Sequence, residues 1–458
     1  MSDVLLDSAP DAPAVRLVSE AETPAALAAA GALAEGLARA QDFRGKPGQA
    51  LLVPAPNGSH GQALFGLGTE GRFSTLRALA ARLPRGDWRI EGRLGDLSAD
   101  DVALAFALGS YRFDRYKKKP DERPRLWVEG ADLTRVRAMA HACNLARDMI
   151  NTPPNDMGPL QIETIAREIA EQHGASLTVV AGEGLLEANY PAVHAVGRAA
   201  APGREPRMIE MAWGQADHPL VAIIGKGVVF DTGGLDIKPS AGMRLMKKDM
   251  GGAAHALALA RMVMAARLPV RLLVLTPSVE NAISGDAMRP GDVLDSRKGL
   301  TIEVGNTDAE GRLILADALT RAEEAAPALT IDLATLTGAA RVALGPQLPP
   351  FMTDDEELAG QIAAAALAVE DPLWRLPLWK GYAEALDSDV ADLKNDPDAW
   401  AQAGAVTAGL FLQRFAPPGP WVHLDIFAWN PKGRPGFPAG GEAMAIRALF
   451  RMIEARFS

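Results

Sequence analysis

Cysteine is nearly absent from this chain. Among its 458 residues only Cys143 is a cysteine, so an internal disulfide is excluded. A chain without disulfides is typical of a reducing compartment, and we expect Cys143 simply to pack in a helix. The amino terminus, MSDVLLDSAPDAP, is acidic and broken by prolines, and it lacks the basic and apolar segments of a secretory signal. Both absences predict a cytoplasmic protein.

Long uninterrupted apolar segments and an excess of basic charge are also missing. Apolar runs such as LALARMVMAARLPVRLLVLTP carry arginines within any window long enough to span a bilayer. The chain has 47 basic and 57 acidic residues, a net charge of −10 and a pI near 5.3. This balance argues against a dominant electrostatic surface for nucleic acid or anionic lipid. We therefore expect no membrane partner and regard nucleic acid as an unfavoured one.

What the sequence does contain is a regular alternation of strands and helices. A hydrophobic content of 48% is ordinary for a globular protein and allows a large buried core. Residues 1–130 alternate short strands with helices and predict a small N-terminal α/β domain. Residues 131–155 predict a connecting helix, with Asp132 as its N-cap, and a proline-rich linker. Residues 156–458 have near-continuous apolar strands separated by helices, which predict a central, mostly parallel sheet covered by helices on both faces.

The segment GNTDAEGR, residues 305–312, places three charges at alternate positions directly before an aliphatic helix. It follows the apolar strand TIEVG. If the segment is extended, Asp308 and Glu310 point the same way and can reach one point. Helix capping is the alternative, because acidic residues favour the first helical turn. Capping does not account for Arg312, whose positive charge is unfavourable at a helix amino terminus.

A second segment, GKGVVFDTGGLDIKPSAGMRLMKKDMGGAA, again places charged residues between an apolar strand and a helix. Each has an ordinary explanation when taken alone. Lys226 and Lys238 would be surface lysines, Asp231 a turn former and Asp249 a helix cap. Loops at the carboxyl ends of strands in one sheet converge on the same edge, however, and ligands gather there. We therefore expect the carboxylates of the two segments to lie together.

Carboxylates gathered in a poorly solvated cleft cannot all stay ionised without cations. Two divalent metal ions would balance them, and an oxygen-rich ligand set favours Mg²⁺, Mn²⁺ or Zn²⁺. A lysine amine becomes a ligand only if the metal keeps it unprotonated. The histidines contribute little, because only His255 lies near these segments, inside an apolar helix where a core role is the ordinary expectation.

Four segments together resemble the signature motifs of one known family. GKGVVFDTGGLDIKPS, MKKDMGGAA, NTDAEGR and DLATLTGA are similar to those of the leucyl aminopeptidase (cytosol aminopeptidase, M17) family. The resemblance extends loosely to WNPKGRPGFPAGGEAMAIRALF and covers the C-terminal two-thirds, whereas the first hundred residues carry no such motif. It implies a cytoplasmic, two-metal exopeptidase that releases amino-terminal residues from short peptides with a free amino terminus. It also implies a homohexamer.

The resemblance further implies a role for each matching residue. Its metal-ligand positions are Lys226, Asp231, Asp249, Asp308 and Glu310, with Asp231 and Glu310 bridging two ions, Mn²⁺ or Zn²⁺. Its catalytic positions are Lys238, which would polarise the scissile carbonyl, and Arg312, which would hold a bicarbonate as general base. Its pocket positions for the first side chain, expected to be Leu, Met or another apolar one, are Met246, Thr335, Leu336 and Gly338.

The sequence differs from the more common form of the family motif at Thr232, Leu235 and Asp236. Asp236 adds an acid near Lys238, and we hypothesise that it influences either the charge of the preferred substrate or the metal preference. Two other functions stay open. The chain could be a DNA-binding architectural or regulatory protein of the same family, which the net charge disfavours, or a metal-dependent phosphohydrolase, for which no P-loop motif is present.

Overall fold

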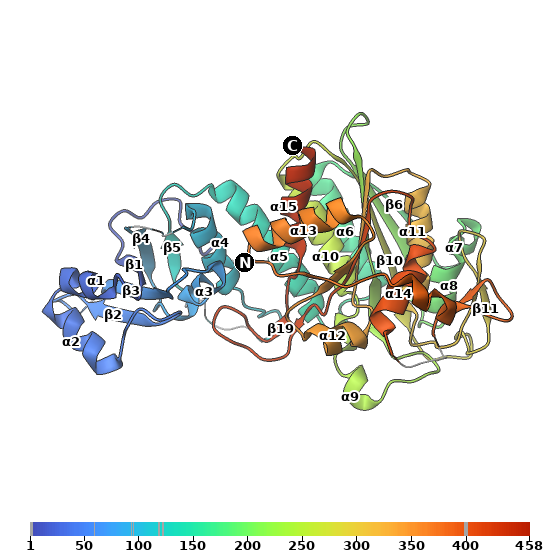
Figure 1. The fold of residues 1–458 in the computed structure, drawn as a ribbon, viewed down its shortest axis with the longest axis horizontal. Coiled ribbons are helices and arrows are strands. Elements are labelled where there is room, and N and C mark those ends of the chain that lie inside the picture. The colour runs from blue at the N-terminus through green and yellow to red at the C-terminus, as the bar shows by residue number, and fades with distance from the viewer. Residues whose placement is uncertain are drawn as a thin grey trace. The chain divides into compact units, whose positions relative to one another are not determined.

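The computed structural model describes residues 3–58, 60–92, 94, 96–117, 120, 123–397 and 402–458. These residues divide into two compact units, and the division falls between Asn144 and Leu145. Figure 1 labels their helices and strands. The smaller unit also includes Lys432–Ala439. The fold is a small N-terminal α/β domain and a larger C-terminal α/β domain with a mostly parallel central sheet, as the sequence predicts. The domain boundaries at residues 130 and 155 stay a prediction.

The smaller unit is built on a five-stranded sheet in the order β2-β3-β1-β4-β5. Its strands are β1 Ala14–Ser19, β2 Ala50–Pro54, β3 His60–Gly68, β4 Asp87–Glu91 and β5 Arg125–Trp127. Its helices are α1 Thr23–Ala30, α2 Ala32–Gln41, α3 Phe73–Leu76, the 3-10 turn Leu79–Ala81 and α4 Ala99–Gly109. Neither β1 nor the two helices α1 and α2 were predicted from the sequence. Helix α1 is almost entirely alanine and other apolar residues, which gives it a weak apolar periodicity.

The predicted connecting helix is α5, Leu133–Asn151. The Asp132 carboxylate accepts a hydrogen bond from the backbone N–H of Arg135 at 3.1 Å, which confirms the predicted N-cap. Cys143 is buried within this helix, as expected. Of the helices described, none combines the length and the apolar character needed to cross a membrane.

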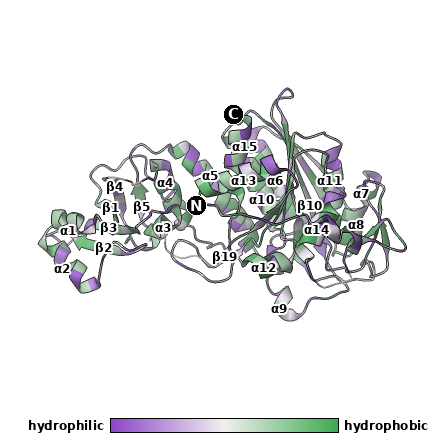
Figure 2. Ribbon diagram, viewed as in Figure 1, coloured by the Kyte–Doolittle hydropathy of each residue, from purple (hydrophilic) through white to green (hydrophobic). Residues whose placement is uncertain are grey.

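The larger unit contains a nine-stranded sheet in the order β15-β14-β17-β13-β8-β10-β7-β6, with β9 also paired to β10. Its strands are β6 Ser176–Ala181, β7 Arg207–Trp213, β8 Leu220–Gly225, β9 Gly227–Asp231, β10 Arg271–Asn281, β13 Leu329–Ala334, β14 Pro350–Met352, β15 Trp374–Arg375 and β17 Trp421–Asp425. The central pairs β10/β8, β8/β13 and β13/β17 are parallel, and antiparallel pairs lie toward the edges. Apolar residues dominate β10 and its neighbours in Figure 2.

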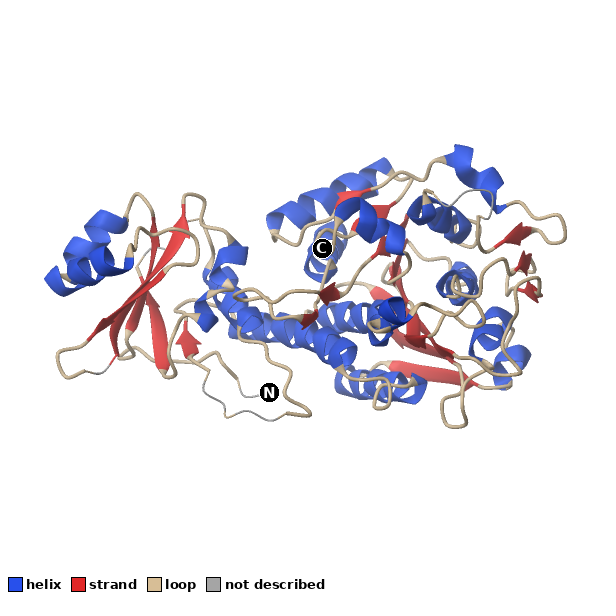
Figure 3. Ribbon diagram, turned by 90° about the horizontal axis from the view of Figure 1, so that it is seen from below, coloured by secondary structure: helices blue, strands red, loops and turns tan. Residues whose placement is uncertain are grey.

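Helices cover both faces of this sheet (Figure 3). Gly225 at the end of β8 faces α10, Gly251–Ala265, so closely that a Cβ atom there would lie 2.5 Å from the carbonyl oxygen of Gly252. The alternate residues of β8 share a core instead with α11, Gly311–Glu323. The other helices of this unit are α6 Pro159–His173, α7 Gly184–Glu187, α8 Pro191–Gly197, α9 Ser240–Met243, α12 Gly338–Leu344, α13 Glu356–Ala368, α14 Gly404–Gln413 and α15 Ile446–Phe457, with 3-10 turns at Met246–Lys248 and Lys380–Leu386.

The continuous apolar run LVAIIGKGVVF forms two strands, β8 and β9, interrupted at Lys226. The backbone N–H of Lys226 donates to Leu333 O at 3.0 Å, and the chain then continues as β9, paired with β10.

The strand before GNTDAEGR does not belong to the large sheet. It is β12, Thr301–Glu303, in a three-stranded sheet with β11, Val293–Asp295, and β16, Leu393–Lys394. The expectation that both charged loops leave strands of one sheet is therefore wrong. Only the middle residue of β12 is buried, whereas strands inside a doubly covered sheet are buried along their length. The remaining short pair is β18 Trp429–Asn430 with β19 Gly440–Gly441.

Candidate active site

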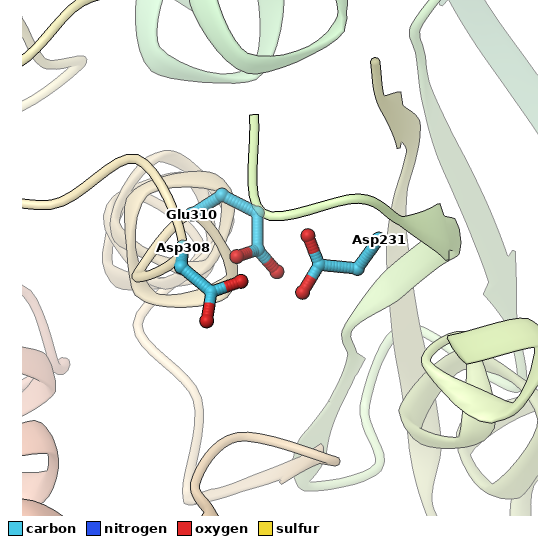
Figure 4. Close-up of side chains that lie close together, drawn as sticks. All are labelled: Asp231, Asp308 and Glu310. Carbon is cyan, nitrogen blue, oxygen red and sulfur yellow. The ribbon is translucent and has the colours of Figure 1, made fainter. Parts of the chain in front are cut away.

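Three carboxylates meet at one point although they come from two different sheets (Figure 4). Asp231 ends β9, while Asp308 and Glu310 precede α11. Ligand oxygens of the three side chains lie within 4.8 Å of one another. Asp231 and Glu310 are only 2% and 1% exposed, and Asp308 is half-buried. Asn281, at the end of β10, links the two segments by donating to Asp231 Oδ1 at 2.8 Å and to Thr307 O at 3.1 Å.

Lys226 connects a fourth carboxylate, that of Asp249, to this cluster. Its Nζ lies 2.8 Å from Asp249 Oδ2 and 3.0 Å from Glu310 Oε1, and it donates to Thr335 O at 3.1 Å. The Thr335 hydroxyl donates in turn to Asp249 Oδ1 at 2.8 Å. Gly311 is required beside Lys226, because a Cβ atom there would lie 2.6 Å from Lys226 Cε. The carboxyl ends of β8, β9 and β13 thus supply Lys226, Asp231 and Thr335, at the sheet edge where ligands bind.

Lys238 pairs with the other two carboxylates of the cluster. Its Nζ is 2.8 Å from Asp231 Oδ2 and forms a second ion pair with Asp308 Oδ1. The loop from Asp231 to Lys238 turns sharply at Gly233, whose φ of +88° and whose close approach to Asp236 O, 2.5 Å from a Cβ atom, both require glycine. The sequence therefore brings both lysines to the carboxylates rather than to the surface.

Burial and mutual repulsion shift the ionisation of this group. Burial, together with the charge of Asp231, raises the pKa of Glu310 to about 8 and that of Asp308 to about 6. Burial disfavours the charged form of Lys226, but Asp249 and Glu310 outweigh it, so the pKa of Lys226 lies above its usual range. The site thus holds more negative charge than its lysines neutralise. The oxygen-rich donor set fits a divalent cation, which would stabilise the ionised form of Glu310.

The capping explanations for Glu310 and Asp249 are wrong. Glu310 occupies the N-cap position of α11, but its side chain makes no capping hydrogen bond. Asp249 precedes Met250, the N-cap of α10, and its carboxylate is directed to Lys226. Asp308 lies in a turn rather than in an extended segment, so the turn and the start of α11 bring the carboxylates together.

Arg312 lies buried in the first turn of α11. Its Nη1 donates to the backbone oxygen of Asn395 at 2.5 Å. Its buried Nε has no hydrogen-bond partner among the residues described. Burial lowers the pKa of this guanidinium. A buried, unpaired donor needs a partner, and a small anion would satisfy it.

Of the four expected pocket residues, Thr335 contacts the charged cluster directly, through Lys226 and Asp249. The backbone N–H of Leu336 donates to the buried Asp425 at 3.0 Å. Gly338 begins α12 and is exposed, and Met246 is half-buried in the turn that leads to Asp249. The structure thus brings Thr335 into the charged site, with Leu336 held beside it.

His255 does not belong to the site, in agreement with the expected core role. It is fully buried in α10, where its Nδ1 is 2.6 Å from Gly251 O and its Nε2 accepts from Met444 N at 2.9 Å. Burial lowers the pKa of His255 to about 4, so the ring is neutral at pH 7.

Asn395, which was not predicted as a site residue, positions the loop before α11. Its side-chain oxygen accepts from Gly305 N at 2.8 Å, and its amide donates to Asn306 O at 2.8 Å and to Ala309 O at 3.2 Å. Together with its bond to Arg312, this makes Asn395 a fixed support for the loop that carries Asp308. A single asparagine about 85 residues from that loop gives no periodic or motif signal, so only the fold reveals it.

Comparison with known proteins identifies the family. Residues 144–450 match the catalytic domain of the cytosol aminopeptidase family, and residues 13–129 match the M17 aminopeptidase N-terminal domain. The second match corrects the view that the resemblance covers only the C-terminal two-thirds. The N-terminal domain lacks charged motifs of the kind that mark the catalytic segments, so short signatures did not reveal it.

Individual relatives agree over nearly the whole chain. A protein of Syntrophotalea carbinolica named "Probable cytosol aminopeptidase" is 39% identical over 448 residues, covering 90% of this chain and 89% of that protein. The crystal structure of cytosol aminopeptidase from Coxiella burnetii has a TM-score of 0.95 at 42% identity and covers 99% of this chain and 100% of that one. The bottromycin maturation enzyme BotP in complex with Mn has a TM-score of 0.87 at 34% identity, covering 98% and 100%. This chain therefore belongs to the cytosol aminopeptidase (M17) family and is a metal-dependent aminopeptidase, an exopeptidase of the hydrolase class.

Proposed function

We propose that this protein releases Leu, Met and other mainly apolar residues from the amino terminus of short peptides by a two-metal mechanism. One observation carries the proposal: two ammonium groups and four carboxylates from separate segments converge at the carboxyl edge of the large sheet. They belong to Lys226, Asp231, Lys238, Asp249, Asp308 and Glu310. Such a convergence of buried like charges is stable only with cationic partners.

The proximity of the carboxylates supports the assignment of the ligands. Asp231, Asp308 and Glu310 would hold one ion, and their oxygens already lie within 4.8 Å. The second ion would take Lys226 and Asp249, with Asp231 and Glu310 shared between the two ions. Lys226 must lose its proton to bind, so loading of the second ion is accompanied by proton release. When bound, a pair of such ions acidifies water and stabilises charge that develops on a carbonyl oxygen.

Lys238 is the residue that we assign to the scissile carbonyl. Burial lowers its pKa, but the charges of Asp231 and other carboxylates outweigh this, so the pKa of Lys238 lies above its usual range and the ammonium form persists. It is also the more exposed of the two site lysines. A protonated amine at the open side of the cluster can donate a hydrogen bond to the carbonyl oxygen of a bound peptide.

Arg312 is assigned to a bicarbonate that would accept a proton from the attacking water. The unpartnered Nε supports this role, because a planar guanidinium can bind an oxyanion through two parallel hydrogen bonds. Met246, Thr335, Leu336 and Gly338 would surround the first side chain of the substrate. A thioether beside small residues accepts Leu or Met without strict shape selection.

Metal analysis combined with a small substrate set tests the proposal. The protein is stripped with a chelator, reloaded with Mn²⁺ or Zn²⁺, and assayed with Leu-p-nitroanilide and its N-acetylated form. We expect two ions per chain and turnover of the free amine only. Equal turnover of both substrates, or full activity in the stripped protein, would overturn the mechanism. Duplex DNA and p-nitrophenyl phosphate, tested in parallel, measure the two other functions.

Assembly and location belong to the same proposal. We propose a homohexamer in the cytoplasm, as the family resemblance implies. Light scattering of the purified protein tests the assembly, and a monomer that is fully active would contradict it.

A further inference from the structure

Asp236 and Thr307 form a reciprocal pair of hydrogen bonds between the two charged loops. Asp236 Oδ2 accepts from the backbone N–H of Thr307 at 2.8 Å and lies 3.1 Å from the Thr307 hydroxyl. The backbone N–H of Asp236 donates to Thr307 Oγ1 at 2.9 Å, and that hydroxyl lies 2.6 Å from Gly233 O. Thr307 is fully buried. The two loops are therefore joined at several points around one threonine.

This pair is close in sequence to the clustered carboxylates of both loops, so its geometry affects their positions. Thr307 directly precedes Asp308, and Asp236 lies between Asp231 and Lys238 in the other loop. The loops approach so closely that a Cβ atom at Gly234, which has a φ of +64°, would lie 2.9 Å from Thr307 Oγ1. A shift at this junction would change the separation of Asp231 from Asp308 without any change of a carboxylate.

We propose that Asp236 and Thr307 are positioning residues that fix the separation of Asp231 from Asp308 and Glu310 and thereby set the affinity of the divalent-metal site. This inference rests on the proposed two-metal function. It also replaces the hypothesis that Asp236 acts through its charge near Lys238. The ion pairs of Lys238 within the described chain go to Asp231 and Asp308, whereas the Asp236 carboxylate is directed to Thr307.

Substitutions at Asp236 separate bonding from charge. Both contacts from Thr307 go to the same oxygen, Oδ2, so the amide oxygen of Asp236→Asn can accept them while the charge is lost. Asp236→Ala removes the acceptor altogether. We expect Asp236→Ala to weaken Mn²⁺ binding by about 10- to 100-fold, the usual effect of losing a support of a metal ligand, and Asp236→Asn to stay within about twofold of wild type.

Substitutions at Thr307 test the same junction from the other side. Thr307→Val keeps the shape but removes the hydroxyl that contacts Asp236 N and Gly233 O. Thr307→Ser restores that hydroxyl. We expect the valine variant to bind Mn²⁺ more weakly than wild type and the serine variant to recover most of the affinity.

The chain contains a matched control for this pair. Thr301 and Asp392 make the same reciprocal contacts, from Thr301 N at 2.8 Å and Thr301 Oγ1 at 2.9 Å to Asp392 Oδ2, and from Asp392 N to Thr301 Oγ1 at 3.0 Å. This second pair is solvent-exposed and contacts none of the clustered carboxylates. Asp392→Ala should therefore leave the Mn²⁺ affinity unchanged.

The measurement is the dissociation constant of Mn²⁺ from chelator-stripped full-length protein, by isothermal titration calorimetry, with circular dichroism to verify the fold of each variant. Weak binding by Asp236→Ala and Thr307→Val, with near-normal binding by Asp236→Asn, Thr307→Ser and Asp392→Ala, supports the inference. Normal binding by Asp236→Ala would overturn it, as would equal weakening by Asp236→Asn or Asp392→Ala. A wild-type protein that binds Mn²⁺ without releasing Leu would refute the proposed function instead and leave the positioning result intact. Wild-type protein that binds no Mn²⁺ would overturn both.

Discussion

Lys226 and Lys238 are both ammonium groups between two carboxylates, yet they lie in different surroundings. The Lys226 side chain is 3% exposed and also bonds the Thr335 backbone, so all of its neighbours are protein atoms. The Lys238 side chain is 15% exposed, and its partner Asp308 is 33% exposed. The ion pairs of Lys226 are therefore enclosed by protein, whereas those of Lys238 are partly exposed to solvent. The difference agrees with the proposed roles, in which Lys226 belongs to the enclosed part of the site and Lys238 contacts the substrate.

Replacing Lys226 should have the largest effect. Lys226→Met removes the cation between Asp249 and Glu310 and leaves two buried carboxylates facing each other. Breaking a buried ion pair from one side costs about 3–5 kcal/mol, so we expect the free energy of unfolding of the metal-free protein to fall by that amount. Urea denaturation measures it. Bound metal and turnover should be lost together.

The surface pair of Lys298 with Glu323 provides the control for that measurement. Their side chains are 29% and 34% exposed. Exposed pairs contribute about 0–1 kcal/mol, so Lys298→Met should change the free energy of unfolding by no more than this. If Lys226→Met and Lys298→Met lower the free energy of unfolding equally, the enclosed position of Lys226 contributes no extra stability, and its distinction from Lys238 is lost.

Asp308 tests the open side of the cluster. Asp308→Asn keeps the shape and one oxygen but removes a ligand charge, so we expect one ion fewer per chain and loss of Leu-p-nitroanilide turnover with the fold retained. Metal analysis by mass spectrometry and circular dichroism check the two parts. The exposed Asp387, changed to Asn in the same way, should retain both ions and activity. Near-wild-type turnover after stripping and reloading would contradict the ligand role of Asp308.

Lys238→Ala should affect turnover alone. Removing one hydrogen-bond donor to a developing oxyanion lowers kcat by about 10²–10³-fold. The metal content should stay at the wild-type level, because Lys238 is assigned to the substrate and not to an ion. If metal content and turnover fall in parallel, Lys238 binds metal and does not act on the substrate, so its role would be the same as that of Lys226.

The same comparison explains how much the sequence could predict. The motifs around Asp231 and Asp308 pointed to a shared carboxylate site because charged residues and glycine turns that follow apolar strands are local features, although the expected extended segment and common sheet were wrong. The sequence alone could not predict the separate sheet of β12 or the support from Asn395. Both depend on pairing with a segment about 90 residues away. The exposure that distinguishes Lys226 from Lys238 also depends on the fold, because it arises from packing around Gly311 and Thr335.

His255 extends the comparison to a buried basic group that has no carboxylate bonded to it. Its two ring nitrogens contact backbone groups, and burial lowers its pKa to about 4, whereas an unfolded histidine has a pKa of about 6.5. A depressed folded pKa means that the stabilisation is present above pH 6.5 and is lost as the pH falls toward 4. Between pH 7 and pH 5 this histidine should account for a loss of about 2 kcal/mol in the free energy of unfolding.

The variant His255→Gln isolates that contribution from other titrating groups. Glutamine can donate and accept hydrogen bonds but does not ionise between pH 5 and 7. The drop in unfolding free energy from pH 7 to pH 5, measured by urea denaturation of metal-free protein, should therefore be smaller in the variant than in wild type. Identical drops in the two proteins would show that His255 remains neutral in the unfolded chain or is charged in the folded one. Either result would end its contrast with Lys226, which keeps its charge in the metal-free protein because carboxylates surround it.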